Sequence, residues 1–587
     1  MDISEDTQKL VEVTILRNAV DYNGRARLES VISKILGSKP EIKTNIQYVI
    51  PKIKEILEQI NSLPIERQRE LLIQKCPSYL GTKKTVEKNE FHLPPLINAK
   101  PGKVVTRFPP EPNGYPHIGH AKAAVIDEEY AKMYSGKLIL RFDDTNPLNE
   151  KIEYYDAILE GLSWLGIAPH IIKNTSDDIK LLHDYGRKLI NKGNAYICLC
   201  DQNSIHDLRS KGLPCQCRIH FDKLLENSDR IFNGYYHQNE AIIRFKGKMN
   251  SNNTAMRDPT LFRIIENTHP KLGNKIILWP TYDFAAPIED SLDGVTHAFR
   301  TKEYELRNEL YQQILKNLEM RIPEIIEFSR LEFEGLPVSK RKLKPLIEEK
   351  IVEGWSDPRL PTLLGLKRRG FTPEAIRKFV LSLGITLSET KPSIEVLEAF
   401  NRKIIDSKSK RLLFVNDPFK VTIKNANPKE VIFKNHPSVE MGNRKIKVNN
   451  VVFISTQDAE KLKKGMEIRL MELYNIKVFQ IDIAKKEAIV EYTDDIVKEN
   501  IKKIQWVSDQ DLVEFTIVKP NKLFIGDKIN RNSLEVLEGF AESFVTTLSD
   551  STMIQFIRLG FCRIEDIMPP CVPWPIMPPI MPPLGAG

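Results

Sequence analysis

The feature that most constrains the fold is a strand–turn–helix–strand order in residues 103–147. KVVTRF (103–108) reads as a strand, HIGHAKAAVIDEEYAKMY (117–134) as a helix, and KLILRFDDTNP (137–147) begins as a second strand. Such a βαβ unit forms a parallel sheet with a right-handed crossover. Ligands of these sheets bind beyond the carboxyl ends of the strands, so a site is expected where the first turn meets the helix.

That turn reads RFPPEPNGYPHIGH (107–120) and places two histidines around a glycine at the helix start. Backbone N–H groups and the positive end of the helix dipole favour an anion there. Gly119 leaves room for a flat ring or a sugar, and His117 and His120 can donate hydrogen bonds to phosphate oxygens. From the motif alone two alternatives stay open. The histidines could simply decorate a helix start, or they could bind a metal, although a third ligand and the glutamate of an HExxH motif are missing.

A second stretch, GLPVSKRKLKPL (335–346), predicts a basic loop. Gly335 and Pro337 indicate the loop, and SKRK (339–342) forms its dense basic tip. Lysines on a mobile loop can close over a triphosphate and neutralise charge at the reacting phosphorus. A solvated basic loop would have the same composition.

The length of the chain, 587 residues, exceeds what one core can organise, and we expect about three to five domains. Apolar residues make up 41% and charged residues 28%, as in soluble globular proteins. No apolar run reaches the ~18 residues of a membrane span, and MDISEDTQKL lacks the order of a signal peptide. We therefore expect a cytoplasmic protein without a membrane partner. The net charge of +8 permits a polyanionic partner without identifying one.

The two ends of the chain differ in pattern. Residues 1–95 are predicted to be helical, because apolar residues recur at helical spacing at Val49, Ile53, Ile56, Leu57 and Ile60. After residues 401–414 come short strands with polar turns, typical of antiparallel barrels: FKVTIKNA, VVFIST, EIRLMELYNIKVFQIDI, EAIVEYT and VEFTIVKP. The Pro- and Met-rich tail, 567–587, is expected to be unpacked, with a partner-binding segment as the alternative.

Four of the seven cysteines are clustered, as two CxC pairs that 14 residues separate. The pairs are Cys198 with Cys200 and Cys215 with Cys217. Four such thiolates can converge on one tetrahedral ion, and Cys₄ sets are usual for structural zinc. The alternative is four reduced thiols near a turn.

Together, the HIGH tetrapeptide and the SK-containing loop are the paired signature of class I aminoacyl-tRNA synthetases. Longer runs narrow the resemblance: RFPPEPNGYPHIGHAKA, LILRFDDTNP, WPTYDFAAPIEDSLDGVTH and VSKRKLKPLIEEKIVEGWSDPRLPTLLGLKRRGFTPEAIRKF. Over roughly residues 100–566 the chain closely resembles the glutamyl/glutaminyl-tRNA synthetase subfamily.

The resemblance implies an α/β Rossmann-type class I catalytic domain, with helical N-terminal and stem-contact regions and C-terminal antiparallel β-barrels. The expected division is a helical N-terminal accessory domain (1–95), two halves of the catalytic domain (100–195 and 276–345), an acceptor-end insertion with the cysteines (196–275), a helical stem-contact region (346–405), anticodon-binding barrels (406–566) and the tail (567–587). Zinc would hold the insertion where it meets the tRNA end, without a catalytic part.

The resemblance also assigns residues to the site. Catalysis falls to His117, His120 and Lys340. The ATP-binding set is Pro109, Glu111, Asn113, Gly114, His117, Gly119, His120, Ser339, Lys340 and Arg341. The amino-acid pocket takes Arg107, Asp143, Tyr282 and Arg300, with Asp143 binding the α-ammonium group. One departure is that the loop, usually KMSKS, has Pro337 and Val338 at its first two positions; another is Pro116, where relatives usually have leucine.

The choice between glutamate and glutamine depends on Arg300. Glutamyl enzymes resemble this chain in having arginine there, whereas glutaminyl enzymes tend to have a small uncharged residue. A guanidinium compensates the second carboxylate of glutamate with fork geometry. Against this, Arg300 could pair with an internal acid such as Glu303. We therefore predict a glutamate–tRNA ligase, most similar to the archaeal type, with glutamine–tRNA ligase, a catalytically inactive tRNA-binding scaffold and a zinc-dependent nucleic-acid-binding protein as rivals.

The expected partners follow from that prediction. They are ATP with Mg²⁺, L-glutamate, tRNA(Glu) and possibly tRNA(Gln), for a monomeric enzyme that requires bound tRNA before activation. Basic clusters at 367–370, 401–411 and 423–429 could track tRNA phosphates, although each also reads as a solvated face.

Overall fold

The structure of the protein is a computed structural model. The structure describes residues 5–21, 24–26, 28–38, 46–75, 93–220, 228–389 and 391–565. The predicted unpacked tail, 567–587, lies outside these described residues. The chain divides into two compact units, Met1–Phe91 and His92–Gly587, which are described separately.

The first unit is helical where it is described. Its helices are α1 (Glu5–Asp21), α2 (Leu28–Ser38), α3 (Ile46–Asn61) and α4 (Ile65–Lys75). The apolar face predicted on α3 is confirmed, because Val49, Ile53, Ile56 and Ile60 are buried in the unit's own core and Leu57 packs against it. The unit therefore has a core of its own.

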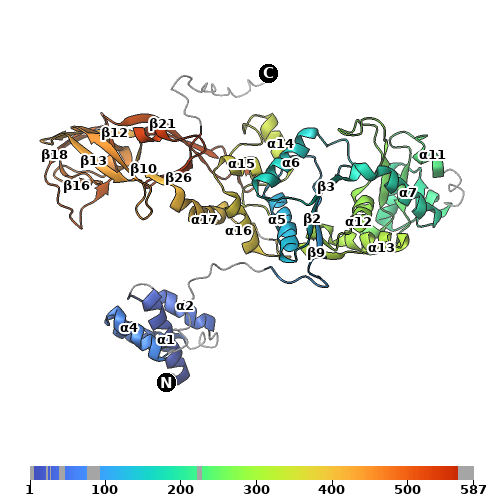
Figure 1. Ribbon diagram of the computed structural model, residues 1–587, viewed down its shortest axis with the longest axis horizontal. Helices are drawn as coiled ribbons and strands as arrows, with labels where there is room; N and C mark the ends of the chain where they lie inside the picture. Colours follow the sequence, from blue (N-terminus) through green and yellow to red (C-terminus); the bar gives the residue numbers. More distant parts are fainter. Residues whose placement is uncertain are drawn as a thin grey trace, which may run out of the picture. The chain divides into compact units, whose positions relative to one another are not determined.

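The second unit begins with the predicted βαβ arrangement, which is confirmed (Figure 1). Strand β1 (Val105–Phe108) pairs in parallel with β2 (Lys137–Phe142), and β2 pairs in parallel with β3 (Ile171–Asn174). Helix α5 (Ile118–Met133) connects β1 to β2, and α6 (Ile152–Trp164) follows β2.

Two further strands lie beside this sheet. Strands β8 (His297–Thr301) and β9 (Glu324–Phe328) form a second parallel pair. The N–H of Thr296 donates to the carbonyl of Val105 at 2.9 Å, so β8 lies beside β1. Segments almost two hundred residues apart therefore meet at one edge. The carboxyl ends of β1, β2 and β8 carry the side chains that the sequence assigned to a site.

An antiparallel sheet lies in the chain between these two sets of parallel strands. It consists of β4 (Ala195–Cys198), β5 (Ile242–Phe245), β6 (Thr260–Ile264) and β7 (Leu278–Pro280), in the order β4-β5-β6-β7. The helices around it are α7 (Ile179–Asn191), α8 (Gln202–Lys211), α9 (Gln216–Ile219) and α11 (Ser228–Phe232). The chain returns to the parallel strands through α12 (Tyr282–Leu292), and α13 (Asn308–Leu318) follows β8.

A helical region follows strand β9 in the chain. Its helices are α14 (Lys340–Glu348), α15 (Leu363–Arg368), α16 (Pro373–Leu383) and α17 (Ile394–Ile405). Helix α16 starts as its sequence predicts, because Thr372 caps the N–H of Ala375 and Pro373 occupies the first turn, where its missing N–H costs nothing. Apolar residues of α15 and α16, such as Leu366 and Phe379, share one core with α5.

The C-terminal part is β-rich, as predicted, but it is not purely antiparallel. Its strands are β10 (Lys410–Leu412), β11 (Phe414–Asn416), β12 (Pro418–Lys424), β13 (Lys429–Lys434), β14 (Asn443–Val448), β15 (Val451–Ser455), β16 (Glu467–Leu470), β17 (Asn475–Asp482), β18 (Glu487–Tyr492), β19 (Lys503–Ile504), β20 (Val507–Ser508), β21 (Leu512–Pro520), β22 (Phe524–Ile525), β23 (Lys528–Ile529), β24 (Leu534–Glu542), β25 (Met553–Phe556) and β26 (Gly560–Arg563).

The largest sheet has the order β19-β16-β17-β18-β12-β15-β20, and its pairs β12–β18 and β16–β19 are parallel. These pairs join strands that are distant in sequence, so hairpin patterns between neighbouring strands could not predict them. The predicted run 467–483 is also two strands, because Glu472 adopts a left-handed φ of 56° in the turn between β16 and β17. Closure of these sheets into barrels stays a prediction.

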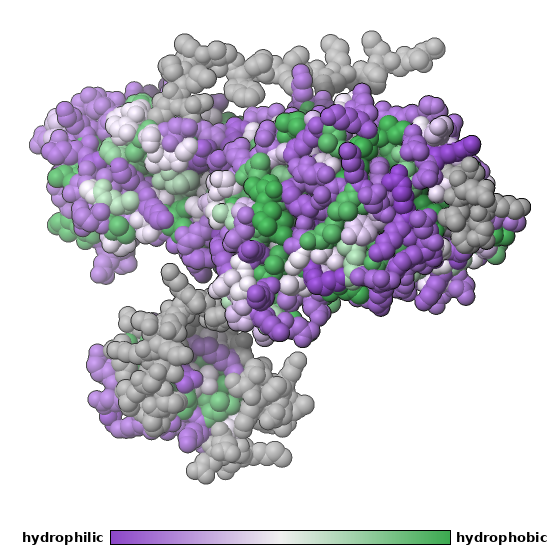
Figure 2. Space-filling view, turned by 45° about the vertical axis from the view of Figure 1, so that its right-hand side comes forward, coloured by the Kyte–Doolittle hydropathy of each residue, from purple (hydrophilic) through white to green (hydrophobic). Residues whose placement is uncertain are grey.

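Polar groups dominate the visible surface of the molecule. Figure 2 shows hydrophilic residues over much of that face, with hydrophobic residues gathered in smaller patches. Within the described ranges, no helix has the length and apolarity needed to cross a lipid bilayer.

Candidate active site

The two histidines cap the start of α5 in a reciprocal arrangement. His117 is the N-cap residue, and its Nδ1 accepts the N–H of Gly119 at 3.1 Å. The N–H of His117 donates in turn to Nδ1 of His120 at 3.2 Å, and the two rings stack with centroids 3.9 Å apart. Because both Nδ1 atoms accept, each neutral ring carries its proton on Nε2. Two parallel N–H donors are thereby fixed at a helix N-terminus.

Burial keeps both rings neutral. It lowers the pKa of His120 to about 4, with a smaller contribution from Arg330, and it lowers the pKa of His117 well below its ordinary value. At neutral pH the rings therefore act as hydrogen-bond donors, without a positive charge of their own.

Acid should destabilise the folded protein through His120. The folded pKa of about 4 lies below the ordinary 6.5, so the unfolded chain binds more protons between these values and stability falls as the pH drops from about 6.5 to about 4. The full effect is on the order of 3 kcal/mol. His120→Asn, which keeps an acceptor for the His117 N–H, should flatten this part of the curve of unfolding free energy against pH. A curve parallel to that of the unchanged protein would contradict the assignment.

The SKRK loop reaches the histidine turn. Nζ of Lys340 donates to the carbonyl of Asn113 and lies 5.2 Å from the ring centroid of Tyr154. At Gly114, an added Cβ would lie 3.7 Å from Cδ of Lys340. Ser339 is the N-cap residue of α14. Two motifs that are far apart in the chain therefore lie against each other, and Lys340 faces the turn while Arg341 is exposed.

A third segment, which the sequence did not indicate, binds the same turn. The N–H of Ile118 donates to the carbonyl of Pro361 at 3.0 Å, and the N–H of Leu363 donates to the carbonyl of Pro116 at 2.8 Å. Thr362 follows as the N-cap of α15. The unusual Pro116 has a packing part here as well, because it lies against Gly161 of α6, where an added Cβ would approach its ring to 3.1 Å.

The Pro-rich part of the turn lies beside the end of β2. The N–H of Asp143 donates to the carbonyl of Pro110 at 3.1 Å. Pro109 directly precedes this contact, and Glu111 directly follows it, with a pKa that burial raises. The predicted ATP-binding turn and the predicted amino-acid ligand are therefore adjacent.

Asp143 offers one free oxygen. Its Oδ1 accepts from Nε of Arg141 at 3.1 Å and from the hydroxyl of Thr175 at 3.0 Å. Its Oδ2 is buried and has no hydrogen-bond partner among the residues that the structure describes. Burial raises the pKa of this carboxyl, and Arg141 opposes that shift. A buried acceptor left open in this way suits a cationic ligand group.

Arg300 lies at the end of β8 with an uncompensated charge. The residue is only 4% exposed. Its guanidinium lies 5.8, 5.1 and 5.0 Å from the ring centroids of Tyr282, Tyr304 and Tyr311, respectively. Nη1 donates to Oδ1 of Asn308 at 2.9 Å, whereas Nε has no partner. In the described ranges no carboxylate forms an ion pair with it.

The alternative pairing of Arg300 with Glu303 is wrong. The carboxylate of Glu303 instead forms an ion pair with Arg330 at 2.9 Å, at the exposed surface. A guanidinium that is buried without an anion is costly, so the position of Arg300 calls for an anionic ligand.

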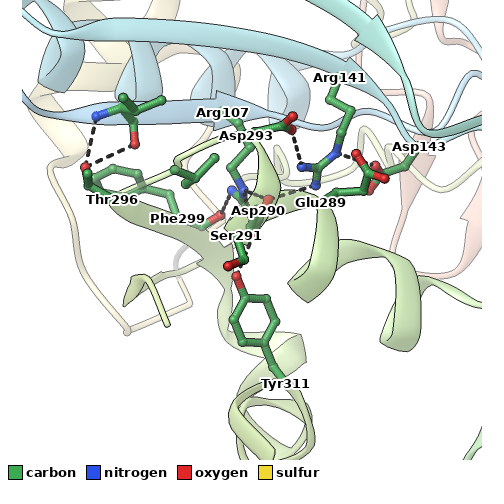
Figure 3. A network of polar contacts seen from close by, with 12 residues as sticks. Arg107, Arg141, Asp143, Glu289, Asp290, Ser291, Asp293, Thr296, Phe299 and Tyr311 are labelled. Atoms are coloured by element: carbon green, nitrogen blue, oxygen red, sulfur yellow. Dashed lines mark hydrogen bonds and ion pairs between the residues drawn. The ribbon is translucent and has the colours of Figure 1, made fainter. Parts of the chain in front are cut away.

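Arg107 uses Nε and Nη1 for contacts inside the protein. It is 1% exposed, its Nε donates to both oxygens of Asp290 at 3.1 Å, and its Nη1 donates to the carbonyl of Phe299 at 2.7 Å. Figure 3 shows how Arg107, Asp290 and Phe299 meet in this network. Asp290 and Arg141 were missed from the sequence, although a charged residue inside the apolar run LILRF was a signal.

The four cysteines come together. Sγ atoms of Cys198 and Cys215 are 3.8 Å apart, those of Cys200 and Cys217 are 3.6 Å apart, and Cys198, Cys200 and Cys215 place their sulfurs within 4.8 Å of one another. No disulfide joins them in the described part of the chain. Arg244, which is 2% exposed, directs Nη1 at the sulfurs of Cys198 and Cys215, at 3.9 and 3.6 Å.

The chain matches known family models over most of its length. Residues 103–407 match the family model described as tRNA synthetases class I (E and Q), catalytic domain. Residues 409–496 and 503–565 match two models described as anti-codon binding domains of the same class.

Relatives extend over nearly the whole chain. A glutamate–tRNA ligase of Cenarchaeum symbiosum is 46% identical over 566 residues, which cover 96% of this chain and 98% of the relative. A glutamate–tRNA ligase of Nitrosopumilus maritimus is 46% identical over 564 residues, and one of Pyrococcus furiosus is 37% identical over 572, each with 96% of this chain and 98% of the relative covered. The chain therefore belongs to the family of class I glutamate and glutamine tRNA synthetases.

Proposed function

We propose that the protein is a glutamate–tRNA ligase. An oxygen of the glutamate α-carboxylate attacks the α-phosphorus of ATP, and the bond to the β-phosphate breaks to give glutamyl-adenylate and pyrophosphate. The terminal ribose hydroxyl of tRNA(Glu) then attacks the glutamyl carbonyl, loses its proton and releases AMP. The observation that carries the choice of glutamate is Arg300, whose buried guanidinium has no protein carboxylate in the described structure.

Each group of the site has a part in activation. The Nε2–H donors of His117 and His120 bind the phosphate oxygens on which charge builds up, and Lys340 neutralises the leaving phosphates. Oδ2 of Asp143 accepts the α-ammonium group, and Arg300 receives the γ-carboxylate. Mg²⁺ bound to ATP as part of the substrate would supply further neutralisation of the phosphate charges.

Pyrophosphate exchange in the presence of tRNA tests this function. Exchange is expected with glutamate and not with glutamine, and aminoacylation with tRNA(Glu) and tRNA(Gln) separates a discriminating enzyme from one that charges both. Exchange with glutamine alone would overturn the choice of amino acid. A single-turnover aminoacylation without product would favour the inactive tRNA-binding scaffold.

We also propose a structural zinc ion at the cysteines. The donor set fits, because the sulfurs of Cys198, Cys200 and Cys215 lie within 4.8 Å of one another, that of Cys217 lies 3.6 Å from that of Cys200, and Cys₄ sites favour zinc. Arg244 adds an independent reason: it is buried, its Nη2 has no partner, and no carboxylate pairs with it within the described ranges. Four zinc-bound thiolates would supply the negative charge that this guanidinium lacks. The ion would fix the inserted sheet and contribute no bond-making step.

Removing the charge of Arg244 should weaken metal binding. We expect about one zinc per chain, and Arg244→Gln should lower its affinity by about 10- to 100-fold in competition with a chromophoric chelator. Arg209→Gln is the matched control, since Arg209 binds the carbonyl of Arg257 and touches no sulfur in the described structure. Metal-free protein with four titratable thiols would contradict the zinc site, and equal affinities would contradict the part of Arg244.

The remaining assignments concern the tRNA. The proposed division keeps 196–275 at the acceptor end and 406–566 at the anticodon, for a cytoplasmic monomer. Lysine and arginine clusters at 367–370 and 401–411 would make binding weaken as salt rises. The function of 1–95 is not assigned.

A further inference from the structure

One buried carboxylate lies where the strands of the glutamate site converge. Asp290, on α12, is fully buried. Nε of Arg107 donates to both of its oxygens at 3.1 Å, Nη2 of Arg141 approaches Oδ1 to 2.8 Å, and the hydroxyl of Tyr311 donates to Oδ2 at 2.9 Å (Figure 3). It therefore joins β1, β2 and α13 to α12.

The two arginines depend on Asp290 to different degrees. Arg141 also pairs with Asp143 at 3.1 Å and with Asp293 at 3.0 Å. For Arg107, Asp290 is the one carboxylate partner among the residues that the structure describes. Both guanidiniums are almost fully buried, so without Asp290 they would repel each other in a medium that screens charge weakly.

Residues proposed to bind the amino acid also depend on Asp290. Arg107 belongs to the proposed amino-acid pocket, and Arg141 holds Oδ1 of Asp143, whose open Oδ2 is the proposed acceptor for the α-ammonium group. Asp290 has no exposed surface and cannot itself reach a ligand. Any effect it has on glutamate passes through the neighbours that contact it, which are Arg107, Arg141 and Tyr311.

We propose that Asp290 is a positioning residue for the amino-acid substrate, which fixes Arg107 directly and Asp143 through Arg141. The proposal rests on the function given above. The change in glutamate binding that this proposal predicts is opposite to that of a simple charge effect. Removal of a negative charge beside the pocket would by itself favour an anionic amino acid, whereas loss of positioning weakens its binding.

The test is Asp290→Asn in tRNA-dependent pyrophosphate exchange. We expect KM for glutamate to rise about 10- to 100-fold while KM for ATP changes less than about twofold. Glu289→Gln is the matched control: Glu289 is the adjacent residue, equally buried, and pairs with Lys173 at 2.8 Å. Burial raises its pKa to about 7, against opposing effects of Arg141 and Lys173, so an amide resembles its neutral form. Glu289→Gln should leave KM for glutamate within about twofold of that of the unchanged protein.

A second variant keeps the test decisive if Asp290→Asn does not fold. Tyr311→Phe removes only the neutral donor to Asp290, and KM for glutamate should rise roughly two- to fivefold with KM for ATP unchanged. An unchanged or lower KM for glutamate in a folded Asp290→Asn protein, or equal losses for both substrates, would overturn the proposal. Failure of the proposed function is distinguishable, because the unchanged protein would then show no glutamate-dependent exchange.

Discussion

His117→Asn should lower the rate of glutamyl-adenylate formation by about 10²- to 10³-fold, the usual cost of losing one preorganised donor at a developing charge. The asparagine amide oxygen can replace Nδ1 as the cap of the Gly119 N–H, so the helix start is retained. It offers no donor at the place of Nε2. His117→Gln has the reverse property, because its longer side chain brings an amide N–H near that place, and it should recover part of the rate. Single-turnover formation of adenylate measures both.

The control for these variants is His183→Asn. His183 is also partly buried, but its Nε2 lies 2.9 Å from the carbonyl of Leu278, away from the turn. His183→Asn should therefore change the rate of glutamyl-adenylate formation little. Equal activities of His117→Asn and the unchanged protein would refute the donor assignment. A glutamine variant much slower than an asparagine variant of nearly full activity would show that the cap geometry, and not Nε2, matters.

Arg300→Met should reduce kcat/KM for glutamate by about 10²- to 10⁴-fold, because removal of one partner from a buried ion pair costs about 3–5 kcal/mol. KM for ATP should change little, since Arg300 lies among Tyr282, Tyr304 and Tyr311 rather than at the histidine turn. Arg300→Lys keeps the charge and loses the planar fork, so an intermediate loss is expected. Pyrophosphate exchange at varied glutamate and varied ATP gives both constants.

The matched control is Arg307→Gln. Arg307 lies in the segment directly after β8, is largely exposed and pairs with Asp283 at 2.9 Å, so its loss should cost less than about 1 kcal/mol. If Arg300→Met weakened ATP and glutamate equally, Arg300 would be a structural residue. A gain of glutamine use in Arg300→Met would instead place Arg300 at the side-chain end of the pocket.

Local patterns were enough to predict the elements around the site. The apolar runs in KVVTRF and KLILRF and the turn that follows the first of them predicted β1, β2 and α5, because each element is decided by neighbours in sequence. The pairing of the histidine turn with the SKRK loop came only through a family resemblance, since no local property connects residues so far apart. The Lys340 contact with Asn113 is consistent with that pairing.

Other features depend on long-range contacts and had no sequence signal of their own. The parallel pair β12–β18 requires knowledge of where the chain returns to the sheet. The partners of a buried charge are equally hidden: Arg107 finds Asp290, whereas Arg300 finds no carboxylate in the described ranges. Sequence alone presents both as arginines beside strands. Whether a buried arginine already has a carboxylate partner, or is left to bind an anionic ligand, can be seen only when its neighbours are known.

Residues 340–363 leave from and return to one short turn. Lys340 is bonded to Asn113 at one end, and Pro361 and Leu363 are bonded to Ile118 and Pro116 at the other. A deletion between α14 and α15 would pull the lysine and the histidines against each other, and an insertion would have to bulge outward to leave them in place. The number of residues in this loop, independent of their side chains, therefore sets the spacing between Lys340 and the two histidines, which are the groups proposed to bind the phosphates.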